Sequence, residues 1–176
     1  MSRLEGEQVA VLLSQEQLHA RIAELGARIT ADYAGRPLKL VGVLKGSFMF
    51  MADLARAIDL PIKVDFIGTT SYQGTNTSGV VRITNDLSRP IDGEHVLLVE
   101  DIVDTGLTMQ YLLQNLATRH PASLEVCALL EKPARAKVQV PVKYRGFSIE
   151  DEFVVGYGLD WDGRFRNLPY LGVVRR

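Results

Sequence analysis

The sequence predicts an α/β fold in which a mostly parallel central sheet is flanked by helices. The apolar run 96–99 has no polar alternation, which is typical of a strand buried on both faces. Two such runs, 38–44 and 96–99, are each followed by a polar turn and an apolar helical segment, as in a strand–turn–helix unit. The length of 176 residues suits one domain with a substantial core.

The N-terminal part predicts a helix between polar boundaries. Ser14 and Gln17 have the spacing of a capping box. One helical stripe of apolar residues follows, and Gly35-Arg36-Pro37 stops it. The stripe consists of Leu18, Ile22, Leu25, Ile29 and Tyr33. A buried strand is then expected over 38–44 and a helix from about 48 to 58.

The remaining elements are read from the same patterns. Strands are expected over 62–68, 80–84 and 124–130, a helix over 107–118, and one or two strands within 138–147. Residues 69–79 are polar and contain glycine, which indicates a loop. That loop is either a plain hairpin connection or a lid over a site.

The turn after the run 96–99 is suited to bind a phosphate. Thr105, Gly106 and Thr108 stand at the start of the expected helix. Free N–H groups at a helix start, with the positive end of its dipole, favour a phosphate. Gly106 lets the backbone approach closely, and the two hydroxyls can donate to phosphate oxygens. Open α/β sheets bind their ligands beyond the carboxyl ends of strands, which is where this turn is expected.

Three acidic residues lie between the apolar run and this turn. Glu100 and Asp101 are acceptors when ionised, so they suit vicinal ribose hydroxyls, directly or through Mg²⁺. Asp104 lies between the expected ribose and phosphate positions, which suits proton transfer. A single acid there would indicate only an acidic helix start, whereas the whole string favours a ligand site.

The string from Glu100 to Gly106 resembles the PRPP-binding signature of type I phosphoribosyltransferases. The chain from about Val41 to Val174 is similar to the hypoxanthine-guanine branch of that family. The resemblance implies one domain, 1–176, with a core of about 38–135 and a small hood from about 1–37 and 136–176. It also implies transfer of the 5-phosphoribosyl group from PRPP to hypoxanthine or guanine, giving IMP or GMP and pyrophosphate, with Mg²⁺ as cofactor.

The resemblance assigns a role to each matching residue, with Asp104 as the catalytic acid/base. Ser71 and Tyr72 would begin the lid, and the Leu44–Lys45 peptide bond would be cis. Leu107, at the variable position of the signature, would serve phosphate through its backbone N–H alone. The other roles are ribose-phosphate binding by Glu100, Asp101, Thr105, Gly106, Leu107 and Thr108, pyrophosphate binding by Lys45, Gly46 and Arg166, purine binding by Lys132, Phe153, Val154 and Asp160, and metal binding by Glu100, Asp101 and Asp160.

Two of these residues have simpler interpretations that the sequence leaves open. Lys132 follows a buried strand and precedes Pro133, which suits a ligand contact, but a solvated lysine at a strand end has the same pattern. Phe153 would stack on the purine in the family, and core packing is the alternative. The resemblance implies contact of Lys132 with the purine 6-oxo group.

Composition narrows the classes of partner. The 20 Lys+Arg against 21 Asp+Glu give no hint of a nucleic-acid partner. Cys127 is the only cysteine and lies in an apolar run, so we expect a buried, inert thiol and no internal disulfide.

The sequence has no 18-residue apolar stretch and no signal-peptide pattern, so we expect no membrane span and a cytoplasmic protein. A homodimer or homotetramer is expected.

Two alternative functions remain open from the sequence. One is a different enzyme on this fold that acts on xanthine, adenine or a pyrimidine; Lys132 and the Phe153 segment argue against all of these except xanthine. The other is a regulator that binds RNA and keeps the PRPP site as a sensor. Such a regulator would need a basic face with aromatic side chains, and no Lys/Arg cluster in the sequence indicates one.

Overall fold

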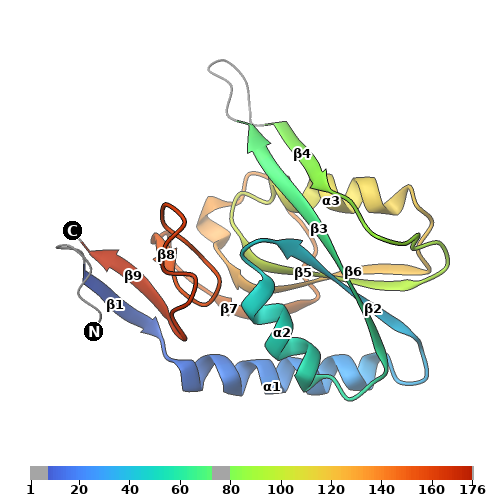
Figure 1. Cartoon of the computed structure of the whole chain (residues 1–176), viewed down its shortest axis with the longest axis horizontal. Helices are drawn as coiled ribbons and strands as arrows, with labels where there is room; N and C mark the ends of the chain where they lie inside the picture. The colour runs from blue at the N-terminus through green and yellow to red at the C-terminus, as the bar shows by residue number, and fades with distance from the viewer. Residues whose placement is uncertain (1–7, 73–79, 176) are drawn as a thin grey trace.

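A computed structural model describes residues 8–72 and 80–175 of the chain, and its central feature is a sheet of six strands (Figure 1). The strand order is β4-β3-β2-β5-β6-β7. Five neighbouring strands are parallel, and β4 is antiparallel to β3. The strands are β2 (Leu38–Leu44), β3 (Ile62–Tyr72), β4 (Val80–Asn85), β5 (His95–Val103), β6 (Ser123–Glu131) and β7 (Tyr144–Ser148). This arrangement confirms the predicted fold class.

Helices cover both faces of the sheet. Helices α1 (Gln15–Asp32) and α2 (Phe48–Ala57) lie over one face, and α3 (Leu107–Ala117) lies over the other. Side chains of a strand alternate between the two faces. On β5, Leu97 and Val99 pack with α1 and α2, while Val96 and Leu98 pack with α3. The apolar run therefore lacks polar alternation because both faces of its strand are buried.

The boundaries of α1 follow from local chemistry. Ser14 Oγ accepts a hydrogen bond from the Gln17 backbone N–H at 3.2 Å, and Gln17 Oε1 accepts from the Ser14 N–H at 2.8 Å. This reciprocal capping box satisfies two backbone donors that a helix start leaves unpaired. The predicted stripe is buried, and Tyr33 caps the end of the helix.

A second, antiparallel sheet joins the two ends of the described chain (Figure 1). Its order is β1-β9-β8, with β1 (Gln8–Leu13), β9 (Leu171–Arg175) and β8 (Val154–Val155). Strand β1 was not predicted, because residues 9–13 are only a short apolar run in the sequence. The division of the domain into a core and a hood stays a prediction. No helix within residues 8–72 and 80–175 is both long and apolar enough to cross a membrane.

The predicted loop 69–79 was wrong in its first four residues. Strand β3 continues to Tyr72, and residues 69–72 pair with β4, from Thr69 opposite Ile83 to Tyr72 opposite Val80. Threonine and tyrosine favour strands when cross-strand neighbours are present, and local polarity concealed this preference. The rest of the predicted loop, residues 73–79, lies outside the described residues.

The predicted strands within 138–147 were also partly wrong. Only Tyr144–Ser148 forms a strand, and residues 136–143 have no regular structure. Pro141 has no backbone N–H to donate to a sheet, which disfavours a strand over this segment. Val140 and Val142 nevertheless pack against the core under α3, which explains their apolar character.

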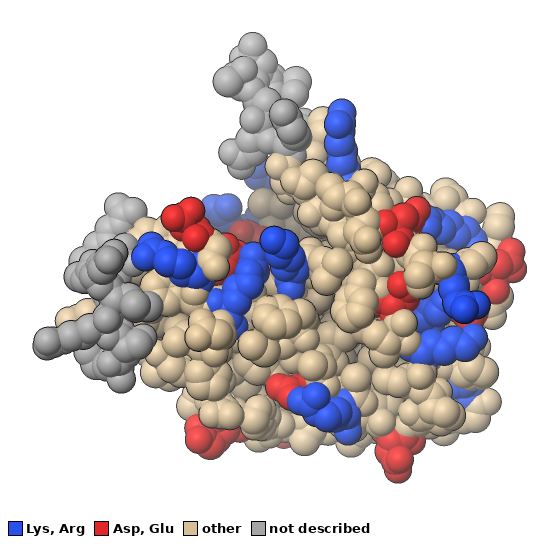
Figure 2. Space-filling view, in the orientation of Figure 1, with Lys and Arg blue, Asp and Glu red and all other residues tan. Residues whose placement is uncertain are grey.

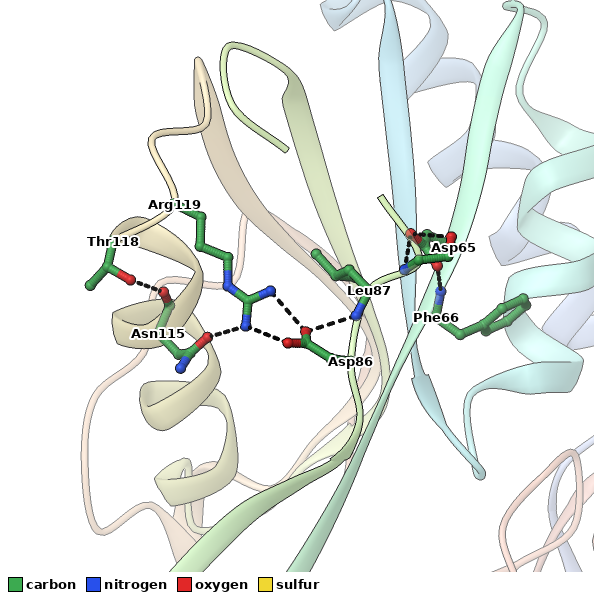
Figure 3. A network of polar contacts seen from close by, with 8 residues as sticks. Asp65, Phe66, Asp86, Leu87, Asn115, Thr118 and Arg119 are labelled. Carbon is green, nitrogen blue, oxygen red and sulfur yellow. Dashed lines mark hydrogen bonds and ion pairs between the residues drawn. The ribbon is translucent and has the colours of Figure 1, made fainter. Parts of the chain in front are cut away.

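Polar contacts fix the connection from β4 to β5 on two sides (Figure 3). The Arg119 guanidinium, just after α3, donates to both Asp86 oxygens at 2.8 and 3.2 Å and to Asn115 Oδ1 at 2.8 Å. On the other side, Asp65 of β3 accepts from the Ser88 backbone N–H and from its hydroxyl, both at 3.0 Å. The chain therefore enters β5 from a connection held between α3 and β3.

Candidate active site

A small cavity lies at the N-terminus of α3, where the turn after β5 enters the helix. Its volume is about 100 Å³. Gly106 is the N-cap residue and has no side chain to cap the helix. The Leu107 backbone N–H donates to Thr105 Oγ1 at 3.4 Å, a long hydrogen bond that a ligand at the helix start could replace. The free N–H groups and hydroxyls suit a phosphate. The cavity is lined by Glu100, Ile102, Val103, Asp104, Thr105, Gly106, Thr108 and Met109.

Gly106 is required by the backbone of this turn. Its φ of 86° lies in the left-handed region, and a Cβ at this position would be 2.8 Å from the Val138 carbonyl oxygen. A side chain there would meet both backbone strain and a steric clash. The backbone and its neighbour Val138 therefore require glycine at this position, whether or not a ligand is bound.

We expect Gly106→Ala to lower the free energy of unfolding by about 1–3 kcal/mol, because alanine is strained at this φ and would clash with Val138. Urea denaturation measures the change. Gly35→Ala is the matched control, because Gly35 has a φ of 74° and a Cβ there would meet no atom within 4 Å. If Gly106→Ala and Gly35→Ala lower the free energy of unfolding equally, the clash with Val138 does not destabilise the protein.

A larger cavity opens beside this turn and joins segments that are far apart in the chain. Its volume of about 330 Å³ is at the lower end of the range for small-molecule sites. The lining residues are Gly46, Asp101, Ile102, Asp104, Lys132, Phe153, Val154, Leu159, Asp160 and Arg166. Sequence reasoning had singled out all of these except Ile102 and Leu159, so the structure brings most of the predicted site residues together.

Lys132 is a buried cation at the wall of the larger cavity. It is 7% exposed, and its backbone N–H donates to the Val103 carbonyl oxygen at 3.0 Å. Among the described residues, the carboxylate nearest to its ammonium is Asp151, with Nζ and Oδ1 3.8 Å apart. Because this separation exceeds a good hydrogen bond, the ammonium keeps donors for a ligand.

Phe153 and Val154 form another part of the wall. Phe153 is 57% exposed, which argues against the alternative that it packs in the core. Val154 lies in β8, the edge strand of the small sheet, and pairs with Val173 of β9. The outer side of an edge strand offers backbone groups that no strand partner takes. An exposed ring beside an open strand edge suits a flat heterocycle with polar edges.

The segment after β8 packs its backbone against the turn after β2. A Cβ at Gly158 would be 2.1 Å from the Gly46 carbonyl oxygen, so only glycine fits there. Arg166 donates to the Gly158 carbonyl oxygen at 2.7 Å and pairs with Asp160, with Nη2 and Oδ1 2.9 Å apart. The second Asp160 oxygen accepts from the Gly163 N–H at 2.8 Å. Arg166 and Asp160 thus bind each other within the same loop.

The turn after β2 also contacts the end of β5. A Cβ at Gly46 would be 1.8 Å from Asp101 Oδ2, so the carboxylate lies directly against the glycine backbone. The expected cis peptide bond between Leu44 and Lys45 is confirmed. Lys45 itself is exposed and lines neither cavity, and Leu107 also lines neither.

Glu100 is a buried acid whose pKa is shifted by its surroundings. It is 7% exposed, and its Oε1 accepts a hydrogen bond from the Asp101 backbone N–H at 3.0 Å. Burial, followed by the neighbouring Asp101 carboxylate, raises the pKa of the Glu100 carboxyl well above its ordinary value. A cation or a hydrogen-bond donor from a ligand would offset this cost, which is consistent with a site that a ligand completes.

The carboxylates fit a metal ion only if the ligand supplies further donors. Residues 8–72 and 80–175 contain no group of three or more His, Cys, Asp or Glu side chains that could hold a metal ion. Glu100, Asp101 and Asp160 therefore do not form a closed site. Mg²⁺ is usually bound by one or two carboxylates together with substrate phosphates, and Glu100 and Asp101 are hard oxygen donors of that kind. The metal assignment stays a prediction.

Asp104 lines both cavities, so it lies where they meet. Its Oδ1 accepts a hydrogen bond from Arg135 Nε at 2.9 Å. Asp104, followed by Asp151, raises the pKa of the Arg135 guanidinium. Sequence reasoning missed Arg135, and its position three residues after Lys132 is the only signal that could have indicated it.

Ser71, one of the two predicted lid residues, lines neither cavity. Ser71 is exposed on β3 and pairs with Val81 of β4, and Tyr72 is the last residue of β3. The segment that would close, 73–79, lies outside the described residues. The lid role of Ser71 and Tyr72 stays a prediction.

A cavity of about 620 Å³ lies elsewhere, at the amino ends of β2 and β3. It contains none of the predicted site residues. The Lys39 and Lys63 ammonium groups in its wall are 2.8 and 2.7 Å from the two oxygens of Glu94. Because its lysines are paired to Glu94 and the predicted site residues line the other two cavities, we place the candidate site at those smaller cavities.

Comparison with known proteins shows the family of the chain. Residues 10–162 match the phosphoribosyl transferase domain family. Because the match spans most of the chain, the protein belongs to that family.

Its relatives define a particular branch. A hypoxanthine phosphoribosyltransferase of Haemophilus influenzae is 54% identical over 170 residues, which cover 94% of this chain and 95% of the relative. A hypoxanthine-guanine phosphoribosyltransferase of Mycobacterium avium is 52% identical over 96% of this chain and 87% of the relative. A crystal structure of a hypoxanthine-guanine phosphoribosyltransferase from Bacillus anthracis superposes with a TM-score of 0.90 at 40% identity, covering 97% of this chain and 100% of that one.

Proposed function

We propose that the protein transfers the 5-phosphoribosyl group from PRPP to hypoxanthine or guanine, giving IMP or GMP and pyrophosphate, as a purine salvage enzyme. The observation that carries the proposal is the meeting of two cavities at Asp104. One cavity has the helix start that suits a phosphate, and the other has the buried Lys132 and the exposed Phe153. The names of the relatives support the same reaction.

Different site residues bind the different parts of PRPP. The turn Thr105–Thr108 binds the 5′-phosphate, and Glu100 and Asp101 hold the ribose hydroxyls. The Lys45–Gly46 turn and Arg166 bind the pyrophosphate. The chemistry supplied by Mg²⁺ when bound is neutralisation of the charge that leaves on pyrophosphate.

The purine is held against Phe153 and β8 while its nitrogen N9 attacks the ribose. Lys132 donates to the 6-oxo group, and Asp104 takes the proton from N7 as N9 forms the new bond. The ribose carries positive charge in the transition state, so the acidic surroundings of Glu100, Asp101 and Asp104 stabilise it. Electrostatic placement contributes more than the proton transfer itself.

Two alternatives receive different support from the fold. An RNA-binding regulator would need accessible aromatic rings beside its cations. Lys143 lies over Tyr33 and Tyr144, whose rings are 2% and 0% exposed, and Arg164 lies over Trp161, which is half-buried. On the face in Figure 2, Lys/Arg and Asp/Glu side chains are interspersed. A xanthine-preferring enzyme would use the same contacts at the 6-oxo group, so the assay below includes xanthine.

We also propose that the enzyme is a homodimer or homotetramer. Phe48 on α2 and Val64 and Phe66 on β3 are 40%, 50% and 37% exposed. Val64 and Phe66 are two residues apart on β3 and therefore lie on the same side of it, and adjoining apolar side chains at a surface favour association. Light scattering of the purified protein measures the mass directly. The cytoplasmic location stays a prediction.

The test of the proposed function is an assay of the purified protein with PRPP, Mg²⁺ and each of four bases. We expect IMP from hypoxanthine and GMP from guanine, essentially no product from adenine, and loss of activity with a chelator. Faster use of xanthine than of either base would favour the xanthine alternative. Absence of any nucleotide product, together with RNA binding in a gel-shift experiment, would favour the regulator.

A further inference from the structure

Four charged side chains of alternating sign are linked beside the candidate site: Asp104 and Lys132 line its larger cavity, and Arg135 and Asp151 connect them. Arg135 is the last residue of the short 3₁₀ helix η1 (Pro133–Arg135). Its Nε is 2.9 Å from Asp104 Oδ1 and 3.7 Å from Asp151 Oδ1. The same Asp151 oxygen is 3.8 Å from Lys132 Nζ. Arg135 and Asp151 therefore connect the two side chains that would meet the purine.

Backbone hydrogen bonds hold the segment after β6 against the end of β5. The Lys132 N–H donates to the Val103 carbonyl oxygen at 3.0 Å, and the Arg135 N–H donates to the Lys132 carbonyl oxygen at 3.1 Å. Two residues later, the Lys137 N–H donates to the Thr105 carbonyl oxygen at 2.9 Å. The segment after β6 is thus bound on both sides of Asp104, which gives Arg135 a defined place beside that carboxylate.

The chemistry of the purine explains why such a connection matters. N7 and the 6-oxo group are adjacent on one edge of the ring, so an acceptor and a donor must reach that edge together. Asp104 supplies the acceptor and Lys132 the donor. Among the described residues, only Arg135 takes an Asp104 oxygen, and it takes Oδ1, which leaves Oδ2 for the purine.

We propose that Arg135 is a positioning residue that orients the Asp104 carboxylate toward N7 and, through Asp151, sets its spacing from Lys132. This inference rests on the proposed function, because it assigns Arg135 a role in purine transfer. Arg135 itself does not contact the purine, so it acts through Asp104. Small misplacements of a catalytic group cost a large part of the rate.

The pair is not needed to hold the fold together. The Arg135 and Asp104 side chains are 45% and 39% exposed, and ion pairs of that exposure contribute little to stability. Removal of Arg135 should therefore slow the reaction without lowering the thermal transition. Arg145 offers a matched control, because its side chain is 48% exposed and pairs with Glu131, which lines neither cavity of the site.

The experiment compares Arg135→Ala with Arg145→Ala in the full-length protein, using hypoxanthine, PRPP and Mg²⁺. We expect Arg135→Ala to lower kcat by about tenfold to 10²-fold, with the KM for PRPP changed by less than about twofold. Arg145→Ala should keep the wild-type kcat. Both variants should unfold at the wild-type temperature.

A double variant separates positioning from a general structural effect. If Arg135 acts only through Asp104, Asp104→Ala combined with Arg135→Ala should be no slower than Asp104→Ala alone. The proposal is overturned if the two single variants at 135 and 145 have equal kcat, or if the effects of Asp104→Ala and Arg135→Ala multiply. An inactive wild type would instead refute the proposed function, before any variant is compared.

Discussion

Replacing Asp104 with alanine is expected to lower kcat by about 10²–10⁴-fold with little change in PRPP affinity. Asp104 lies where the phosphate cavity meets the purine cavity, so its carboxylate is close to both reacting partners. Without it, nothing accepts the N7 proton, and one negative charge beside the developing ribose cation is lost. Steady-state kinetics with hypoxanthine, varied at saturating PRPP, measures the effect.

Two further variants show whether the carboxylate itself is responsible. Asp104→Asn keeps the size and can still pair with Arg135 through its amide oxygen, but it cannot take a proton. It should be nearly as slow as Asp104→Ala. Asp59→Ala is the control, because Asp59 is exposed and lines neither cavity of the site. Turnover near the wild-type value in either Asp104 variant would contradict the catalytic assignment.

The central part of the fold was predictable because its pattern is local. Val96–Val99 has no polar alternation, and the structure shows helices on both faces of that strand. The capping box at Ser14 and the glycine before α3 are also short-range features, and both mark helix starts in the structure. Such features can be predicted from short sequence segments, because the residues that determine them are close together in the chain.

The parts that were missed depend on pairing with another strand. Strand β1 exists because Gln8–Leu13 pairs with Leu171–Arg175 at the other end of the chain. Residues 69–72 are a strand because β4 returns beside them. Such pairing is decided by tertiary contacts, which override local propensity.

The residues of the candidate site were also only partly predictable from the sequence. Asp104 and the phosphate turn could be inferred from residue chemistry, whereas the roles of Lys132 and Phe153 came from the family resemblance. Neither source indicated Arg135 or Asp151. Ion pairs between loops follow from how the loops are placed, and this information is absent from a local pattern.

Lys132→Ala is expected to remove most of the activity toward hypoxanthine and guanine. A buried ammonium has donors but no acceptor, so it can satisfy the 6-oxo group of either base. Adenine presents an amino group at that position, donor against donor, and a buried polar group left unpaired costs roughly 1–3 kcal/mol, more when it is charged. Sites that select a substrate by such a hydrogen bond prefer it over the mismatched base by about 10⁴-fold. The wild type should therefore leave adenine essentially unused.

A base-competition assay with PRPP and Mg²⁺ measures this selectivity in the wild type and in Lys132→Ala. The variant should lose kcat/KM for both oxopurines, with a smaller effect on the KM for PRPP, because Lys132 lines the purine cavity and not the phosphate cavity. Lys63→Ala is the matched control: that lysine is paired to Glu94 at the separate cavity and should leave selectivity unchanged. Efficient use of adenine by the wild type, or full oxopurine activity in Lys132→Ala, would mean that the ammonium does not read the 6-oxo group.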